Sequence, residues 1–222
     1  MKTILLSCAF LLATSIAFAQ SEKYMSTMAA KVVAVDTTFS PAGLVELSNS
    51  FERIADVEKT QWLPYYYAAL TEINSGYMQA KGADIMSGKM AVIFDPIADR
   101  AEALLNKAEA LSKDNSEIWT VKKMITSLRM MGNPMQRYKM MEQATDELET
   151  ARKLNPENPR VYMLLGQDKF TTPEQFGGSK EEAAKLFALA IEKFKAAKPE
   201  SAIAPRWGRG TVEYFMKAAD KQ

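Results

Sequence analysis

Apolar residues recur every three or four positions along almost the whole chain after residue 20, and this spacing is typical of amphipathic helices. Glycine and proline fall mostly between these periodic segments, where they end one helix and begin the next. The pattern therefore predicts an all-α protein. We expect about nine helices, at residues 22–36, 41–57, 61–76, 96–112, 117–131, 134–154, 159–170, 180–197 and 205–219.

Several of the predicted helices begin with a capping residue, which can accept a hydrogen bond from the first turn. Ser179, followed three residues later by Glu182, matches a capping box, in which each residue satisfies the other's backbone N–H. Short links between the segments predict helical hairpins that lie side by side. Four further predicted helices have a side-chain acceptor directly before a proline that needs no N–H: Ser40, Asp95, Asn133 and Asn158.

A motif of one small, one large and one small residue, spaced by four and then three positions, recurs along the chain. Small residues let two helices approach closely, and the large residue fills the gap between hairpins. This spacing, with Tyr162 and Gly166 on a partner helix, resembles the tetratricopeptide repeat. The resemblance implies an α-α superhelix (solenoid) of about four degenerate hairpins. The motif falls at Ala101, Leu105 and Ala108, at Ala144, Leu148 and Ala151, at Ala183, Phe187 and Ala190, and more loosely at Leu47, Phe51 and Ile54.

The chain as a whole resembles a group of exported tetratricopeptide proteins of similar length from the Bacteroidota. The segments that carry this resemblance are residues 51–55, 62–69, 155–160, 172–180 and 207–208. The group has no established activity, so the resemblance implies a fold and a compartment and implies no mechanism.

The first nineteen residues are typical of a secretory signal peptide. Lys2 precedes an apolar run that ends in Ala17, Phe18 and Ala19, which predicts cleavage after Ala19. The run is too short to span a membrane, and too few apolar residues precede Cys8 for a lipoprotein signal. We therefore expect export to the bacterial periplasm without a lipid anchor. Residues 20–222 then form one domain, with an irregular insertion at about residues 77–95.

The composition excludes several kinds of chemistry. The 222 residues include no histidine and one cysteine, Cys8, and 28 basic residues stand against 27 acidic ones. A chain without histidine has neither a Ser-His-Asp triad nor a histidine-ligated metal, and a balanced charge is not typical of nucleic-acid binding. We expect a protein that is not an enzyme, with no cofactor, no metal site and no nucleic-acid partner.

In the register of the repeat, apolar and aromatic side chains face the concave groove. We expect this groove to bind an unidentified protein or extended peptide, in a non-catalytic scaffolding role, by burying apolar anchors. Alternatively, these side chains pack within the superhelix itself. Two different functions also fit the sequence: a small-molecule carrier or hydrolase with a pocket under the 77–95 connection, and a structural protein that self-associates. The predicted groove residues are Trp62, Tyr65, Met124, Arg160, Met163 and Gln167.

Overall fold

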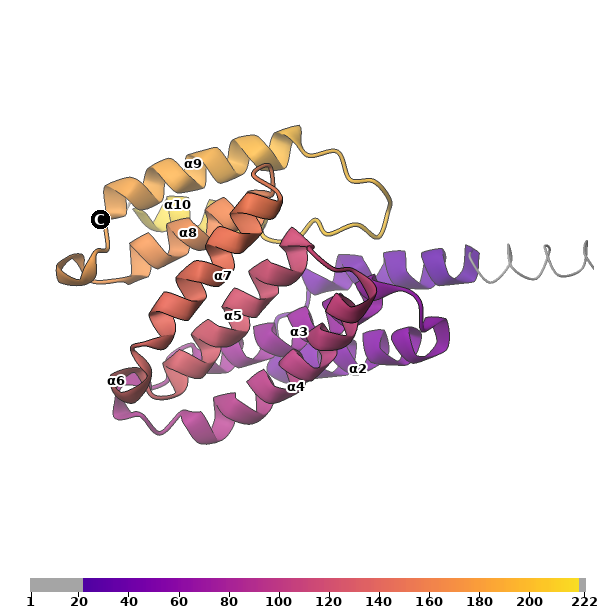
Figure 1. Ribbon diagram of the computed structural model, residues 1–222, viewed down its shortest axis with the longest axis horizontal. Helices are drawn as coiled ribbons and strands as arrows, with labels where there is room; N and C mark the ends of the chain where they lie inside the picture. The colour runs from indigo at the N-terminus through magenta and orange to yellow at the C-terminus, as the bar shows by residue number, and fades with distance from the viewer. Residues whose placement is uncertain (1–21, 220–222) are drawn as a thin grey trace, which may run out of the picture.

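The computed structural model describes residues 22–219, and these residues contain helices and connections but no strand (Figure 1). The predicted all-α class is confirmed, whereas the predicted signal peptide and Cys8 lie outside the described residues. The N-terminal helix spans residues 22–35. It is followed by α2 (Pro41–Glu58), α3 (Trp62–Ala80), the 3₁₀ turn η1 (Ile85–Ser87), α4 (Ala91–Leu111), α5 (Ser116–Gly132), α6 (Pro134–Arg137), α7 (Met140–Leu154), α8 (Pro159–Thr171), the 3₁₀ turn η2 (Glu174–Phe176), α9 (Lys180–Ala196) and α10 (Arg209–Ala219).

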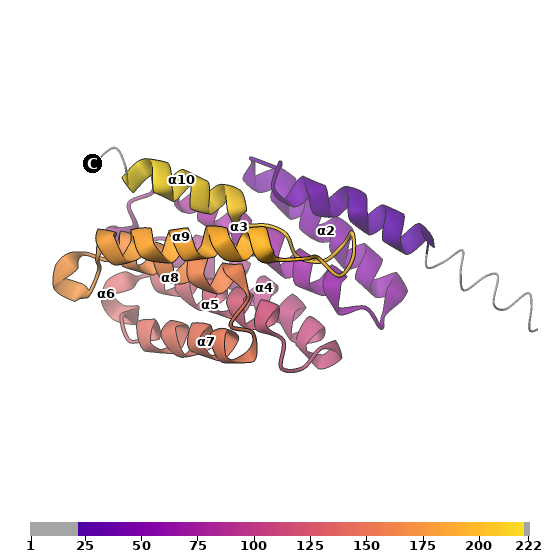
Figure 2. The same cartoon turned by 90° about the horizontal axis from the view of Figure 1, so that it is seen from above.

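Consecutive helices pack against one another as antiparallel pairs. Helix α3 lies between α2 and α4, α5 lies between α4 and α7, and α8 packs on α9. Figure 2 shows the N-terminal helix and α10 on one side of the molecule and α4 and α7 on the other. The predicted arrangement of helical hairpins is therefore confirmed.

The small and large residues of the repeated motif form the contacts between these helices. All of them are buried except Ile54, which is half-buried beside the buried Ala55. On the partner helix, a Cβ atom at Gly166 would lie 2.6 Å from the ring of Phe187. Glycine is thus required at this position, because α8 and α9 approach closely there.

The predicted caps form at four of the five helix starts. Ser40, Asn133, Asn158 and Ser179 each accept a hydrogen bond from a backbone N–H of the first turn. At Ser179 only half of the capping box forms, since the N–H of Ser179 donates to a carbonyl of α8 and the Glu182 carboxylate pairs with a lysine of that helix.

The predicted helix start at Asp95 is wrong, because α4 begins at Ala91 and contains Pro96. Proline is tolerated there because the carbonyl it leaves without a helical partner belongs to Val92, a solvent-exposed residue. Asp95 instead accepts two hydrogen bonds from Arg137, at 2.6 and 2.8 Å. Arg137 also donates to the carbonyl of Arg129, near the end of α5. Helix α6 ends at Arg137 and α7 begins at Met140, whereas one helix was predicted over residues 134–154.

Two further segments differ from the prediction. Within the predicted 77–95 insertion, α3 continues to Ala80, η1 follows at Ile85–Ser87 and α4 begins at Ala91, so the irregular part is confined to residues 81–90. The last helix begins at Arg209 rather than at residue 205, because residues 203–207 form turns and irregular structure that hydrogen bonds hold against Tyr66 and Tyr67 of α3. The connection between α9 and α10, residues 197–208, therefore joins the C-terminal hairpin to the N-terminal half of the molecule.

Candidate functional site

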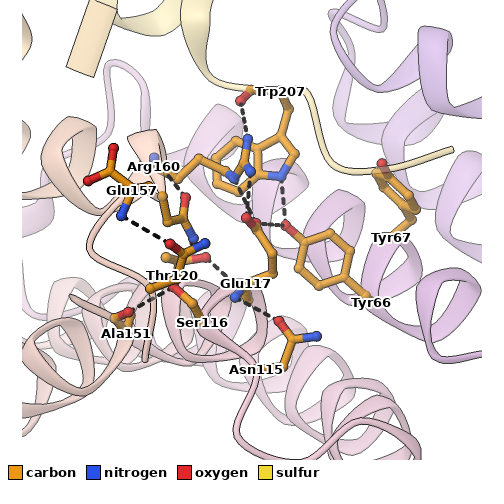
Figure 3. Close-up of polar contacts among 12 residues, drawn as sticks. Tyr66, Tyr67, Asn115, Ser116, Glu117, Thr120, Ala151, Glu157, Arg160 and Trp207 are labelled. Atoms are coloured by element: carbon orange, nitrogen blue, oxygen red, sulfur yellow. Dashed lines mark hydrogen bonds and ion pairs between the residues drawn. The ribbon is translucent and has the colours of Figure 1, made fainter. Parts of the chain in front are cut away.

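Arg160, the charged member of the predicted groove, is buried in an ion pair with Glu117 of α5 (Figure 3). Its Nε and Nη2 atoms donate to the two carboxylate oxygens, the first at 2.6 Å. Its Nη1 atom donates to the carbonyl of Trp207 at 3.4 Å. Burial lowers the pKa of Arg160, but the Glu117 carboxylate, together with Tyr66 and Tyr67, raises it, and the pKa of Arg160 lies above its ordinary value. Arg160 is therefore a charged residue that holds helices together.

The α9–α10 connection completes this buried network. The Tyr66 hydroxyl donates to Glu117 at 2.9 Å and accepts a hydrogen bond from the Trp207 indole N–H at 2.7 Å. The neighbouring Tyr67 hydroxyl donates to the carbonyl of Ile203 at 3.0 Å. These contacts place the connection against the side chains that were predicted to line an open groove.

The other predicted groove residues are also largely covered. Met124 and Met163 are buried, and Gln167 is half-buried. Tyr65 is buried and donates to Asp56 of α2. Trp62 is half-buried and packs edge-on against Tyr66, with 5.4 Å between ring centroids. Trp62 and Arg160 are thus linked through Tyr66, which packs on Trp62, and Glu117, which pairs with Arg160. The predicted groove residues do not form one open surface, because most of them pack between the helices.

An open cleft of about 460 Å³ lies elsewhere, between the N-terminal helix and the second half of α2. Its lining residues recur every three or four positions on each helix, so each helix presents one continuous face to the cleft. This volume is in the range of ligand pockets, roughly 300–1,000 Å³. The lining residues are Lys23, Tyr24, Thr27, Lys31, Ser50, Arg53, Ile54, Val57 and Glu58.

The cleft combines apolar walls with a basic rim. Ile54 is half-buried, and Val57 is 68% exposed although its side chain is wholly apolar. Three of the lining residues are basic and one, Glu58, is acidic. The cleft therefore offers apolar contacts together with positive charge.

The Tyr24 side chain lines this cleft and carries a hydroxyl group that has no hydrogen-bond partner among residues 22–219. The residue is 8% exposed, and its oxygen is buried. Burial raises the pKa of Tyr24 to about 12, and the nearby Glu58 carboxylate adds to that rise. Most buried polar groups in proteins are hydrogen-bonded; among the described residues, Tyr24 and Glu147 each carry a buried side-chain oxygen that is an exception.

Sequence reasoning did not identify this cleft. The helical spacing of Tyr24, Thr27 and Lys31 was available as a signal, but the chain does not show which helix packs beside them.

A second hollow of about 530 Å³ lies between α5 and α7. It is acidic, with Glu142, Asp146 and Glu147 among its lining residues. The Trp119 ring, which also lines it, is already covered by the ammonium group of Lys122, 4.2 Å from the ring centroid.

In the described part of the chain, no group of three or more acidic residues is placed to hold a metal ion. Across residues 22–219, no helix has the length and apolar character needed to cross a membrane.

Comparison with known proteins relates the chain to a solved structure. No protein-family model and no curated protein matches the chain. Among solved structures, the chain is similar to the HusA haemophore from Porphyromonas gingivalis, with a TM-score of 0.74 and 32% sequence identity. The match covers 89% of this chain and 93% of that chain. Porphyromonas gingivalis is a member of the Bacteroidota, which agrees with the expected group, whereas the tetratricopeptide assignment stays a prediction.

This similarity corrects the predicted function. A haemophore carries haem, so the prediction of a scaffold that binds a protein or peptide is wrong. A haemophore is also a binding protein rather than an enzyme, which confirms the prediction that the chain is not an enzyme.

Proposed function

The chain belongs to the family of the HusA haemophore, and we propose that it binds haem in the cleft between the N-terminal helix and α2. The observation that supports this location is the combination of apolar walls and a basic rim in one open cleft of about 460 Å³. The acidic hollow between α5 and α7 lacks that combination.

The walls of the cleft would hold the macrocycle. Haem is a flat and largely apolar ring, and Ile54 and Val57 offer it aliphatic contacts on α2. Val57 is 68% exposed, so a ligand that covers it removes apolar surface from water. Such burial contributes roughly 25 cal/mol per Å² of apolar area, and this is the main stabilising contribution expected for the complex.

The basic rim would hold the two propionate groups. Lys23, Lys31 and Arg53 provide ammonium and guanidinium donors for carboxylates. The hydrogen bond from Arg53 to Ser50, 3.0 Å long, lies within α2. Arg53 can therefore turn toward a propionate without breaking a contact between helices. These exposed pairs orient the ligand, and each adds at most about 1 kcal/mol.

Two expectations from the sequence belong with this function. The predicted signal peptide would export the protein from the cytoplasm, and we propose that it handles haem in the periplasm or beyond. Its mature chain has no histidine, so any iron ligand must come from the other residue types used by haem proteins, such as tyrosine or methionine.

Titration of the mature protein with haemin, followed by absorbance, tests this function. The wild type is expected to shift the Soret band and saturate. A Val57→Asp variant places a carboxylate on the apolar wall, and we expect it to bind about tenfold more weakly, which corresponds to about 1.4 kcal/mol.

Val33→Asp is the matched control. Val33 has a similar exposure, 62%, and lies on the N-terminal helix without lining the cleft. This variant should keep the wild-type affinity. A wild type that leaves the haemin spectrum unchanged would exclude the function, and an equal loss of affinity in both valine variants would exclude the location.

A further inference from the structure

Exposed apolar side chains gather at one end of the molecule, where α6 packs on η1 in the connection between α3 and α4 (Figure 1). Two further contacts hold these segments together. A Cβ atom at Gly132 would lie 3.0 Å from the Cα atom of Ala91, and Arg137 of α6 pairs with Asp95 of α4. The exposed side chains on these segments, which we call the apolar tip, are Met86, Val92, Ile93, Met135, Tyr138 and Met141.

The apolar tip is unusual for the surface of a protein. Val92 and Met135 are 78% and 71% exposed, and single exposed apolar residues are ordinary, whereas a group of them marks a contact with another protein or with a membrane. None of the six side chains lines the cleft beside α2 or the acidic hollow beside α7. Neither hollow therefore explains their exposure.

Positive charge flanks the apolar tip. Lys81 and Lys89 lie in the α3–α4 connection and Lys139 follows Tyr138; all three lysines are exposed, and their ammonium groups have no ion-pair partner in the described part of the chain. The acidic residues Asp84 and Glu142 are also exposed at this end, so the excess of positive charge is small. Two copies that met tip to tip would bring the lysines together, and like charges repel. The charge thus favours an anionic partner over a second copy of the chain.

The types of side chain favour a lipid surface over an acidic protein. The anchors of protein interfaces are enriched in tryptophan, tyrosine and arginine that fill preformed pockets, whereas five of the six residues of the apolar tip are methionine, valine or isoleucine. The sixth, Tyr138, is of a type that is common at the interface of membrane and water. Lysines close to a membrane are attracted to anionic headgroups.

We propose that the apolar tip docks on the surface of a membrane that contains anionic phospholipids. Its apolar side chains enter the headgroup region, and the three flanking lysines lie at the level of the lipid phosphates. The inference does not depend on haem binding, because the apolar tip and the proposed haem cleft have no residue in common.

Co-sedimentation of the mature protein with lipid vesicles tests this proposal. Vesicles of phosphatidylcholine and phosphatidylglycerol in equal parts are compared with vesicles of phosphatidylcholine alone. The wild type should bind the mixed vesicles about tenfold more tightly, and added salt should weaken this binding because it screens exposed charges. Val92→Ser combined with Met135→Ser should bind the mixed vesicles about tenfold more weakly than the wild type. Lys89→Glu combined with Lys139→Glu should show no preference for the anionic vesicles.

Val33→Ser combined with Phe39→Ser is the matched control. These two apolar residues are also exposed, but they lie on the N-terminal helix and in the connection that follows it. This variant should bind vesicles as the wild type does. Because every substituted residue is exposed, all of the variants should keep the melting temperature of the wild type and its response to haemin.

Three results would overturn the proposal: a wild type that sediments with neither kind of vesicle, equal binding to both kinds, or an equal loss in the control variant. Sedimentation equilibrium supplies a fourth. A dimer of the wild type that Val92→Ser with Met135→Ser abolishes would assign the apolar tip to a second copy of the chain instead of a membrane.

Discussion

The Arg160–Glu117 ion pair is expected to be a major contribution to the stability of this fold, and Arg160→Met tests this. Methionine keeps most of the side-chain volume but removes the charge and both hydrogen bonds to the carboxylate. The side chains of Arg160 and Glu117 are 7% and 15% exposed, so water cannot replace the lost donors at Glu117. Removing one partner of a buried pair destabilises a protein by about 3–5 kcal/mol, which is a large part of a typical total of about 5–15 kcal/mol.

The magnitude follows from what remains around Glu117 in the variant. The hydroxyl of Tyr66 still donates to it at 2.9 Å, but one neutral hydrogen bond does not offset a buried carboxylate. Urea denaturation followed by circular dichroism should therefore show a lower midpoint with an unchanged slope.

A second variant, Glu117→Gln combined with Arg160→Met, removes both charges and keeps an acceptor for Tyr66. We expect it to be more stable than Arg160→Met alone by about 1–3 kcal/mol, because no buried charge is left unpaired. A loss below about 1 kcal/mol in Arg160→Met, or simple additivity in the double variant, would refute this reasoning.

Two further predictions concern other parts of the fold. Gly178→Ala should destabilise the protein by about 2 kcal/mol or more in the same assay, because its Cβ atom would lie 1.7 Å from the carbonyl oxygen of Thr172; wild-type stability would contradict this. Burial raises the pKa of Glu147, so this carboxyl group favours folding below its ordinary pKa and loses that contribution as pH rises through the raised value. Glu147→Gln should therefore raise the melting temperature at pH 7 and give no such gain at about pH 4; an equal gain at both pH values would contradict it.

Local signals in the sequence predicted most of the helices. Ser40, Asn158 and Ser179 cap their helices because a cap depends on a few neighbouring residues. The same reasoning failed at Asp95, because its partner, Arg137, comes 42 residues later in the chain. Capping patterns thus predict a helix start correctly when no distant residue competes for the capping side chain.

The candidate site could not be predicted in the same way. The groove residues were assigned from the register of the repeat, but Trp207 bonds to Tyr66 across 141 positions and fills that region. The cleft depends on which helix packs beside the N-terminal helix, whereas helical periodicity describes each helix by itself. Tyr24 also looks like an ordinary core residue in the sequence, since only the fold reveals that its hydroxyl has no partner in the described part of the chain.

The most direct test of the central claim, haem binding in the cleft between the N-terminal helix and α2, is a map of the bound iron by nuclear magnetic resonance. Ferric iron broadens the amide signals of nearby residues, and the diamagnetic gallium porphyrin provides the control. With haemin bound, we predict selective loss of the signals of residues 23–31 and 50–58, which line the cleft. Loss of signals confined to other helices, with these two segments unchanged, would contradict the account.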